Sequence, residues 1–235
     1  MLLETVNLKK TYRTGKVDVE ALRGVNLRIR AGELVAIMGP SGCGKSTLMH
    51  LLGAMARATS GQVLVDGQDI ADMNDAQRTE IRRSKIGFVF QKLNLLPTLT
   101  ARANIAVART IQGSEGDPQT DSYLADILKL LKIDEKLDRK PSELSGGEQQ
   151  RFAIARAVSH RPSIVLADEP TGALDSKNSE AVLQMFKELN RKFQQTILLV
   201  THNPELAGYA DRLIEMRDGL IVHDSGGAST AASGT

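Results

Sequence analysis

The stretch LVAIMGPSGCGKST, residues 34–47, decides the fold. Its first five residues are all apolar, which is typical of a strand buried on both faces of a sheet. Glycines then crowd residues 39–44, and because glycine weakens helices and strands alike, the backbone there must bend tightly or approach a ligand closely. The residues that follow favour a helix, which we expect over 46–55. The order is therefore strand, glycine-rich turn and helix.

The glycine-rich turn fits the phosphate-binding pattern G-x-x-x-x-G-K-S in full. Its backbone N–H groups can surround an anion, and the following helix adds unpaired N–H groups and the positive end of its dipole. Lys45 can reach the β- and γ-phosphates of a nucleotide, the Ser46 hydroxyl can coordinate Mg²⁺, and Thr47 can bind a phosphate oxygen. An ordinary glycine-rich turn is the alternative. The predicted nucleotide-binding residues are Gly39, Pro40, Ser41, Gly42, Cys43, Gly44, Lys45, Ser46 and Thr47.

A second apolar run, residues 164–167, ends in two carboxylates. Mg²⁺ prefers hard oxygen ligands, so we expect Asp168 to hold the metal, through water. Hydrolysis needs a group that orients or deprotonates the attacking water, and Glu169 is the candidate. The alternative is an acidic strand end without chemistry. Beside the phosphate loop, the pair predicts an ATPase with ATP and Mg²⁺ as its cofactors.

A second anion-binding surface is predicted at residues 144–148, LSGGE. This run opens a helix expected over 148–158, and Ser145 and Glu148 stand at the spacing of a capping box. A helix start that carries two glycines and a serine exposes N–H groups to an anion. The longer run LSGGEQQR resembles the signature motif of the ABC-type ATPases, and the resemblance covers about residues 2–224.

The resemblance implies further site residues. Tyr12 would stack on adenine, Gln91 would sense Mg²⁺ and the γ-phosphate, and His202 would contact the γ-phosphate. A plain edge-strand tyrosine and a buried core histidine are the alternatives for Tyr12 and His202. The resemblance implies the following full set: catalytic Lys45, Glu169 and His202; metal-binding Ser46, Gln91 and Asp168; and nucleotide-binding Tyr12, Gln91, Ser145, Gly146, Gly147 and Glu148 besides the phosphate loop.

In this family the signature of one subunit closes over the ATP held by the other. The expected partners are therefore a second copy of the chain, in an ATP-sandwich homodimer, and a separate integral membrane permease. Apolar residues that follow Gln91 either meet the permease or pack under the helices. These are Leu93, Leu95, Leu96, Pro97 and Leu99.

The patterns predict an α/β protein interrupted by helices. With the resemblance, this becomes a P-loop NTPase (RecA-like) core with an antiparallel β subdomain and an inserted α-helical subdomain. The core is expected at about 1–91 and 159–224, the helical subdomain at about 92–158, and a flexible tail at 225–235. Strands are expected at 25–29, 34–38, 62–65, 87–90, 163–167, 196–200, 213–216 and 220–223, helices at 46–55, 74–83, 123–131, 148–158 and 179–192, and a loop at 112–120.

Composition limits the kinds of partner and the cellular compartment that we expect for this protein. A net charge of +2 argues against a dedicated nucleic-acid binder, so no nucleic-acid partner is expected. The single cysteine, Cys43, excludes an internal disulfide and favours a reducing compartment. In the phosphate loop its small thiol could be tolerated for size or activated by Lys45. No run approaches the roughly 18 apolar residues of a membrane span. We therefore expect a peripheral protein on the cytoplasmic face of the inner membrane.

Three runs, residues 10–29, 81–105 and 167–180, most resemble the group of ABC ATPases that powers lipoprotein release, macrolide and peptide export, and cell-division signalling. Amino-acid importers contain similar stretches. Soluble ABC proteins of chromosome maintenance carry long coiled-coil arms, and translation-type members usually carry two cassettes. An ATP-sensing regulatory subunit with little turnover is a further alternative, although Glu169 and His202 are both present.

Overall fold

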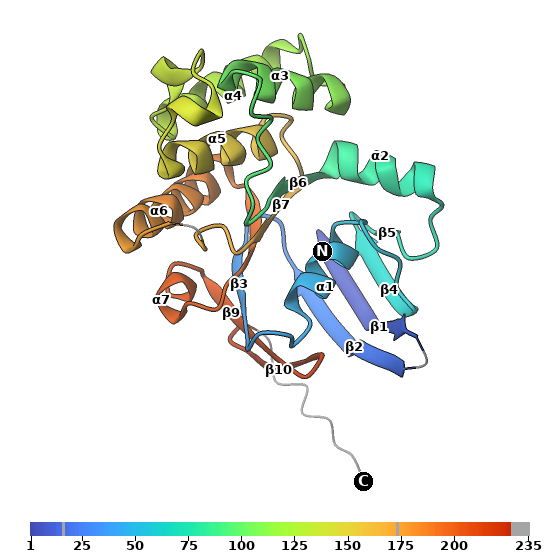
Figure 1. Ribbon diagram of the computed structural model, residues 1–235. Coiled ribbons are helices and arrows are strands. Elements are labelled where there is room, and N and C mark those ends of the chain that lie inside the picture. The colour runs from blue at the N-terminus through green and yellow to red at the C-terminus, as the bar shows by residue number, and fades with distance from the viewer. Residues whose placement is uncertain (16, 173, 227–235) are drawn as a thin grey trace.

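The computed structural model describes residues 1–15, 17–172 and 174–226. Two sheets share one core in an α/β arrangement (Figure 1). A six-stranded sheet has the order β10-β9-β3-β8-β7-β6, and a four-stranded sheet has the order β2-β1-β4-β5. The predicted P-loop NTPase fold with an antiparallel β subdomain and inserted helices is confirmed.

The larger sheet is parallel except at its β9-β10 edge. Its central strands were predicted to within one residue, because continuous apolar runs suit strands covered on both faces. Parallel pairing puts the carboxyl ends of all these strands along one edge. The strands are β3 (Leu34–Met38), β6 (Ile86–Val89), β7 (Ile164–Asp168), β8 (Thr196–Val200), β9 (Arg212–Arg217) and the antiparallel β10 (Leu220–Asp224).

Two apolar clusters lie on the two faces of this sheet. Alternate residues of β7 point to opposite sides, so Leu166 joins a cluster around α1 (Lys45–Leu52), and Val165 joins a cluster under the helices. The first cluster also contains side chains of the antiparallel sheet, so α1 is held between the two sheets (Figure 1). Where α1 ends, a Cβ at Gly53 would overlap the Phe88 ring, so only glycine fits.

The smaller sheet consists of β1 (Leu3–Thr14), β2 (Val17–Ile29), β4 (Ser60–Val65) and β5 (Gln68–Asp69). Of the two long strands, only residues 25–29 of β2 were predicted from the sequence, and β1 was not predicted. The register between these strands shifts between Thr5 and Leu8, after Leu8, and after Lys10. Each shift breaks the in-out alternation that identifies a half-buried strand, so the periodic signal is lost.

The helical subdomain contains α3 (Ala101–Gln112), α4 (Pro118–Leu130) and α5 (Gly146–Val158), with 3-10 turns at Asp134–Lys136 and Pro141–Glu143 (Figure 1). The loop predicted at 112–120 is shorter than expected, because Asp117 caps α4 by accepting hydrogen bonds from Gln119 and Thr120, and Pro118 suits a first helical turn. The remaining helices are α2 (Asp75–Lys85), α6 (Ser176–Phe193) and α7 (Pro204–Ala207).

The predicted tail, 225–235, falls largely outside the described residues, apart from its first two. Ser225 donates its backbone N–H to Leu213, and Gly226 donates to Asp224, so both belong to the hairpin. No helix within the described ranges combines the length and apolar character needed to cross a bilayer.

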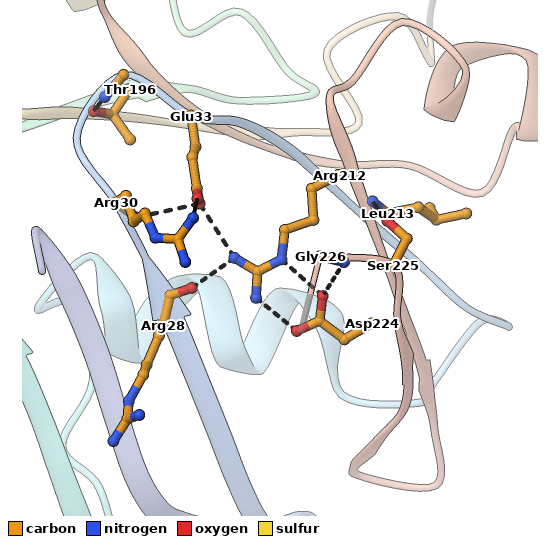
Figure 2. A network of polar contacts seen from close by, with 10 residues as sticks. Arg28, Arg30, Glu33, Thr196, Arg212, Leu213, Asp224, Ser225 and Gly226 are labelled. Carbon is orange, nitrogen blue, oxygen red and sulfur yellow. Dashed lines mark hydrogen bonds and ion pairs between the residues drawn. The ribbon is translucent and has the colours of Figure 1, made fainter. Parts of the chain in front are cut away.

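Arg212 joins the two sheets at the edge of the larger one. Its guanidinium makes two hydrogen bonds with the Asp224 carboxylate, at 2.7 and 2.6 Å, and reaches Glu33 at 3.2 Å (Figure 2). It also donates to the carbonyl of Arg28 on β2, at 2.8 Å. The Arg212 side chain is only 12% exposed, so these contacts are poorly replaced by water. The network ties β9, β10 and β2 together.

We expect Arg212→Met to lower the free energy of unfolding by about 2 kcal/mol, because it leaves the Asp224 and Glu33 carboxylates without their shared cation. Arg28→Met is the matched control. The Arg28 side chain is mostly exposed and pairs only across the surface with Glu4, so its loss should cost less than about 1 kcal/mol. Urea denaturation measures both. Equal losses would show that the Arg212 network contributes no more than an exposed pair.

Candidate active site

The phosphate loop connects β3 to α1 and is pressed against two neighbouring strands. A Cβ at Gly39 would overlap the carbonyl oxygen of Met216 on β9, and a Cβ at Gly44 would lie 2.5 Å from the carbonyl oxygen of Ala21 on β2. Both glycines also have positive φ angles, of 156° and 104°. The path of this loop therefore requires glycine at both positions.

The turn of the C-terminal hairpin braces the same loop. The Gly219 N–H donates to the Cys43 carbonyl at 3.0 Å, and the Gly219 carbonyl accepts from the Arg23 N–H at 3.0 Å. The Cys43 side chain itself is buried in the core cluster around α1. The Cys43 Sγ lies 4.0 Å from the Lys45 ammonium nitrogen, and burial limits the access of a thiol reagent. Activation of the thiol by Lys45 stays a prediction, and the small size of the side chain suits the packed core.

Lys45 lies within the loop and is nearly buried. Its ammonium donates to the carbonyl oxygens of Gly39, at 2.7 Å, and Pro40, at 3.0 Å. These partners are neutral. A phosphate would offer charged oxygens, which make stronger hydrogen bonds with an ammonium.

Asp168 ends β7 beside the start of α1. Burial raises the pKa of Asp168, although a hydrogen bond with the Ser46 side chain acts in the opposite direction. Its Oδ1 atom is buried and has no hydrogen-bond partner among the residues that the structure describes, which is rare for a buried polar atom. A carboxylate oxygen without a partner next to a hydroxyl fits Mg²⁺, which takes one or two protein oxygens and fills its other positions with water and phosphate.

Glu169 and His202 meet across neighbouring strands. Glu169 follows β7, His202 follows β8, and His202 Nδ1 lies 2.8 and 2.9 Å from the two carboxylate oxygens. The Glu169 backbone has a φ of 47°, an unfavourable conformation for a residue with a side chain, and it is fixed by a hydrogen bond from its N–H to the Val200 carbonyl. The His202 side chain is 71% exposed, which rules out a buried core histidine.

Gln91 follows β6 and reaches the loop that carries Glu169. A Cβ built at Gly172 would lie 3.0 Å from the Gln91 amide nitrogen and 3.4 Å from the Glu169 carbonyl oxygen. Gln91 therefore lies beside the predicted catalytic loop while it connects the core to the helical subdomain.

Tyr12 lies on the antiparallel sheet. It pairs with Val19 of β2, two residues before Ala21, whose carbonyl contacts Gly44 of the phosphate loop. The Tyr12 residue is 40% exposed, and the Lys10 ammonium lies 4.8 Å from its ring centroid. This placement leaves the ring accessible to a flat ligand next to the loop.

The predicted capping box at the start of α5 is confirmed. The Ser145 hydroxyl oxygen accepts from the Glu148 N–H at 3.3 Å, and the Glu148 carboxylate accepts from the Ser145 N–H at 2.9 Å. Lys136 forms an ion pair with the same carboxylate and holds the pKa of Glu148 below its usual value, with the Ser145 backbone adding to the effect. Ser145 and Gly146 are exposed, whereas Gly147 packs against Asn178.

The structure thus brings Lys45, Ser46, Asp168, Glu169 and His202 to one edge of the parallel sheet. It places Ser145–Glu148 elsewhere, on the helical subdomain. Sequence reasoning missed Lys136, because its partner lies 12 residues further along the chain and no local motif links the two.

A family model, relatives of similar sequence and solved structures all match this chain over most of its length. The model of the family described as ABC transporter matches residues 22–172. A macrolide export ATP-binding/permease protein, MacB, of Syntrophobacter fumaroxidans is 47% identical over 226 residues, which make up 96% of this chain and 32% of that protein. An uncharacterized ABC transporter ATP-binding protein of Methanocaldococcus jannaschii, MJ0796, is 43% identical over 95% of this chain and 96% of its own length.

Two solved structures also match, each with a TM-score of 0.84 and 41% identity, covering 94% of this chain and 97% of theirs. One is a dimeric post-hydrolysis state of the cassette MJ0796 bound to ADP and phosphate, and the other is a dimeric structure of the same cassette. The chain therefore spans about a third of the MacB relative and almost all of the single-cassette one.

The buried Asp168 carboxylate generates a stability prediction. Because its folded-state pKa is raised, the folded protein binds more protons than the unfolded chain as pH rises from about 4 through the raised value, so stability falls over that interval. We expect Asp168→Asn to remove this decline and to stabilise the protein by about 1 kcal/mol at neutral pH, while Mg²⁺-dependent ATP hydrolysis is lost. Thermal unfolding at several pH values, without nucleotide, tests the stability claim. A destabilised variant at pH 7 would contradict it.

Proposed function

The chain belongs to the ABC transporter family, and on that premise we propose that it works as one half of an ATP-binding homodimer that drives a membrane permease. ATP hydrolysis is the activity of the cassette. The observation that carries the proposal is the contact of Glu169 with His202, beside the Asp168 carboxylate and the Lys45 ammonium. This grouping provides a proton acceptor and positive charge at one strand edge.

Each group has a distinct proposed role. Glu169 orients the attacking water and accepts its proton, and His202 holds the carboxylate so that it faces the γ-phosphate. Lys45 and the loop amides bind the β- and γ-phosphates. Ser46, Asp168 and Gln91 would hold Mg²⁺. When bound, the metal ion neutralises phosphate charge.

The homodimer follows from the separation of the two anion-binding surfaces. We assign the signature of each chain to the nucleotide held by the other, with Ser145 and the first N–H groups of α5 facing the γ-phosphate. The dimeric structures of MJ0796 support the homodimer. Within it, the Glu148 carboxylate acts as a cap rather than as a nucleotide ligand, because its oxygens already contact Ser145 and Lys136.

The energetics of such a dimer are reasonable. Moving a population from mostly open to mostly closed takes about 5.5 kcal/mol of differential binding. Charge-assisted hydrogen bonds contribute roughly 1.5–3 kcal/mol each. Two or three new ones at each of two γ-phosphates therefore suffice after ordering costs, and loss of the γ-phosphate on hydrolysis releases the dimer.

We expect Glu169→Gln to slow ATP hydrolysis by at least about 100-fold, because the amide cannot accept a proton, and to accumulate an ATP-bound dimer. Phosphate release and size-exclusion chromatography with ATP measure the two effects. Glu188→Gln, on the surface of α6, is the control and should behave as wild type. Wild-type turnover in Glu169→Gln would exclude Glu169 from catalysis.

A groove beside Gln91 is the proposed contact with the permease. It lies between α2, β6, α3 and α5, has a volume of about 450 Å³, and is lined by the apolar side chains of Phe88, Phe90, Leu96, Val107 and Ile111, among others. Ile111, Leu96 and Val107 line this groove and are 66%, 44% and 39% exposed, and several exposed apolar side chains gathered in one place are typical of a contact surface. We propose that a short apolar helix of the permease occupies this groove.

The burial of the segment after Gln91 varies from residue to residue. Leu96 is exposed at the groove, which supports a contact with the permease, whereas Leu95 packs against the core cluster under the helices. The side chain of Asn104 fixes the segment by accepting from the Leu96 N–H at 2.7 Å and donating to the Leu96 carbonyl at 3.1 Å. Arg156 adds hydrogen bonds to the carbonyls of Leu93 and Asn94. These hydrogen bonds hold the backbone of the groove wall in place.

We expect Ile111→Glu to abolish copurification with the permease, because it places a charge on an apolar contact surface, while ATP hydrolysis by the isolated cassette stays within about twofold of wild type. Val222→Glu, at an exposed β-branched residue of β10, is the matched control and should keep the permease. Retention of the permease by Ile111→Glu would place the contact elsewhere.

The proposed branch is the one for export, lipoprotein release or mechanical transmission, and the proposed location is the cytoplasmic face of the inner membrane. The name of the MacB relative, a macrolide export protein with its own permease, supports the branch. The cargo and the permease belong to parts of the system outside the cassette.

A further inference from the structure

We propose that Lys136 is a positioning residue for the half of the ATP site that faces the partner chain. It neutralises Glu148 and thereby holds Ser145 ready for the γ-phosphate of the nucleotide bound by the second copy. This inference rests on the proposed function, because it requires the two-chain ATP sandwich.

The contacts form a short chain from Lys136 to Ser145. The Lys136 ammonium pairs with Oε1 of Glu148, and Oε2 of Glu148 accepts from the Ser145 N–H at 2.9 Å. Each carboxylate oxygen thus has its own partner. A change at Lys136 is therefore transmitted through one side chain to the backbone of the signature serine.

Lys136 is presented from a fixed position. It ends the 3-10 turn Asp134–Lys136, and its backbone N–H donates to the carbonyl of Ile133 at 3.1 Å. Ile133 is 1% exposed and anchors the turn in the core of the helical subdomain. The fold therefore anchors the backbone of Lys136 within reach of Glu148, while its side chain is 47% exposed.

The capping box determines what Ser145 can offer to a ligand. Its hydroxyl oxygen accepts a hydrogen bond from the Glu148 N–H, so the proton of the hydroxyl is left to donate. The residue is exposed at the tip of α5. An approaching phosphate oxygen could accept hydrogen bonds from this hydroxyl and from the backbone N–H groups at the start of α5 that are not already bonded to Ser145.

Glu148 carries the only carboxylate of the signature run 144–151, at the end of the helix that must approach a γ-phosphate. Its side chain is 20% exposed, so water screens its charge only in part. Without a cation beside it, this carboxylate would repel the phosphate. Lys136 offsets part of that repulsion, and Glu148 keeps its role in the cap.

The test measures ATP-driven dimerisation in a Glu169→Gln background by analytical ultracentrifugation. We expect Lys136→Gln to weaken the dimer about tenfold, because both symmetric sites lose the interaction. The affinity of the monomer for ATP, set by its own phosphate loop, should not change. Lys136→Arg should retain dimerisation, and Lys129→Gln, at an exposed lysine of α4, is the matched control.

A second substitution separates charge neutralisation from a general structural effect. Glutamine at position 148 can still accept from the Ser145 N–H but carries no charge. We therefore expect Glu148→Gln to restore dimerisation to the Lys136→Gln variant. Unchanged dimerisation in Lys136→Gln, or failure of Glu148→Gln to rescue it, would overturn the inference alone. Failure of the Glu169→Gln parent to dimerise with ATP would overturn the proposed homodimer as well.

Discussion

The register of three parallel strands determines where every reactive group lies. Ile37 of β3 pairs with Val200 of β8, and Val200 pairs with Asp168 of β7. The phosphate loop begins two residues after Ile37, Glu169 directly follows Asp168, and His202 stands two residues after Val200. A slip of one residue in either pairing would turn Asp168 to the opposite face of the sheet, away from Ser46. The apolar side chains that pack into the two core clusters oppose such a slip.

This arrangement places two carboxylates, Asp168 and Glu169, next to each other at the end of β7, where partial burial disfavours their charged forms. Each carboxylate has different hydrogen-bond partners. Asp168 has the Ser46 hydroxyl and a free oxygen, whereas Glu169 has the His202 ring. The backbone of Glu169 is strained as well, because its positive φ is unfavourable for a residue with a side chain. This conformation lowers the stability of the fold and places the Glu169 carboxylate beside His202.

Much of this could be read from sequence, for identifiable reasons. The buried strands β3, β7 and β8 have continuous apolar runs with sharp ends. The phosphate loop and the signature are each a short, continuous run of residues, so each can be recognised as a local motif. The remainder depends on pairing that no local pattern reveals. The shifted register concealed β1, the capping role of Asp117 concealed the start of α4, and the contacts between Glu169 and His202 and between Lys136 and Glu148 join separate elements.

The hydrogen bonds of Gly219 have a mechanical consequence. They join the hairpin turn to the phosphate loop through Cys43 and to β2 through Arg23, while Arg212 fastens the other end of the hairpin to the same strand. A displacement of the hairpin would therefore be transmitted to the phosphate loop and to β2 at the same time.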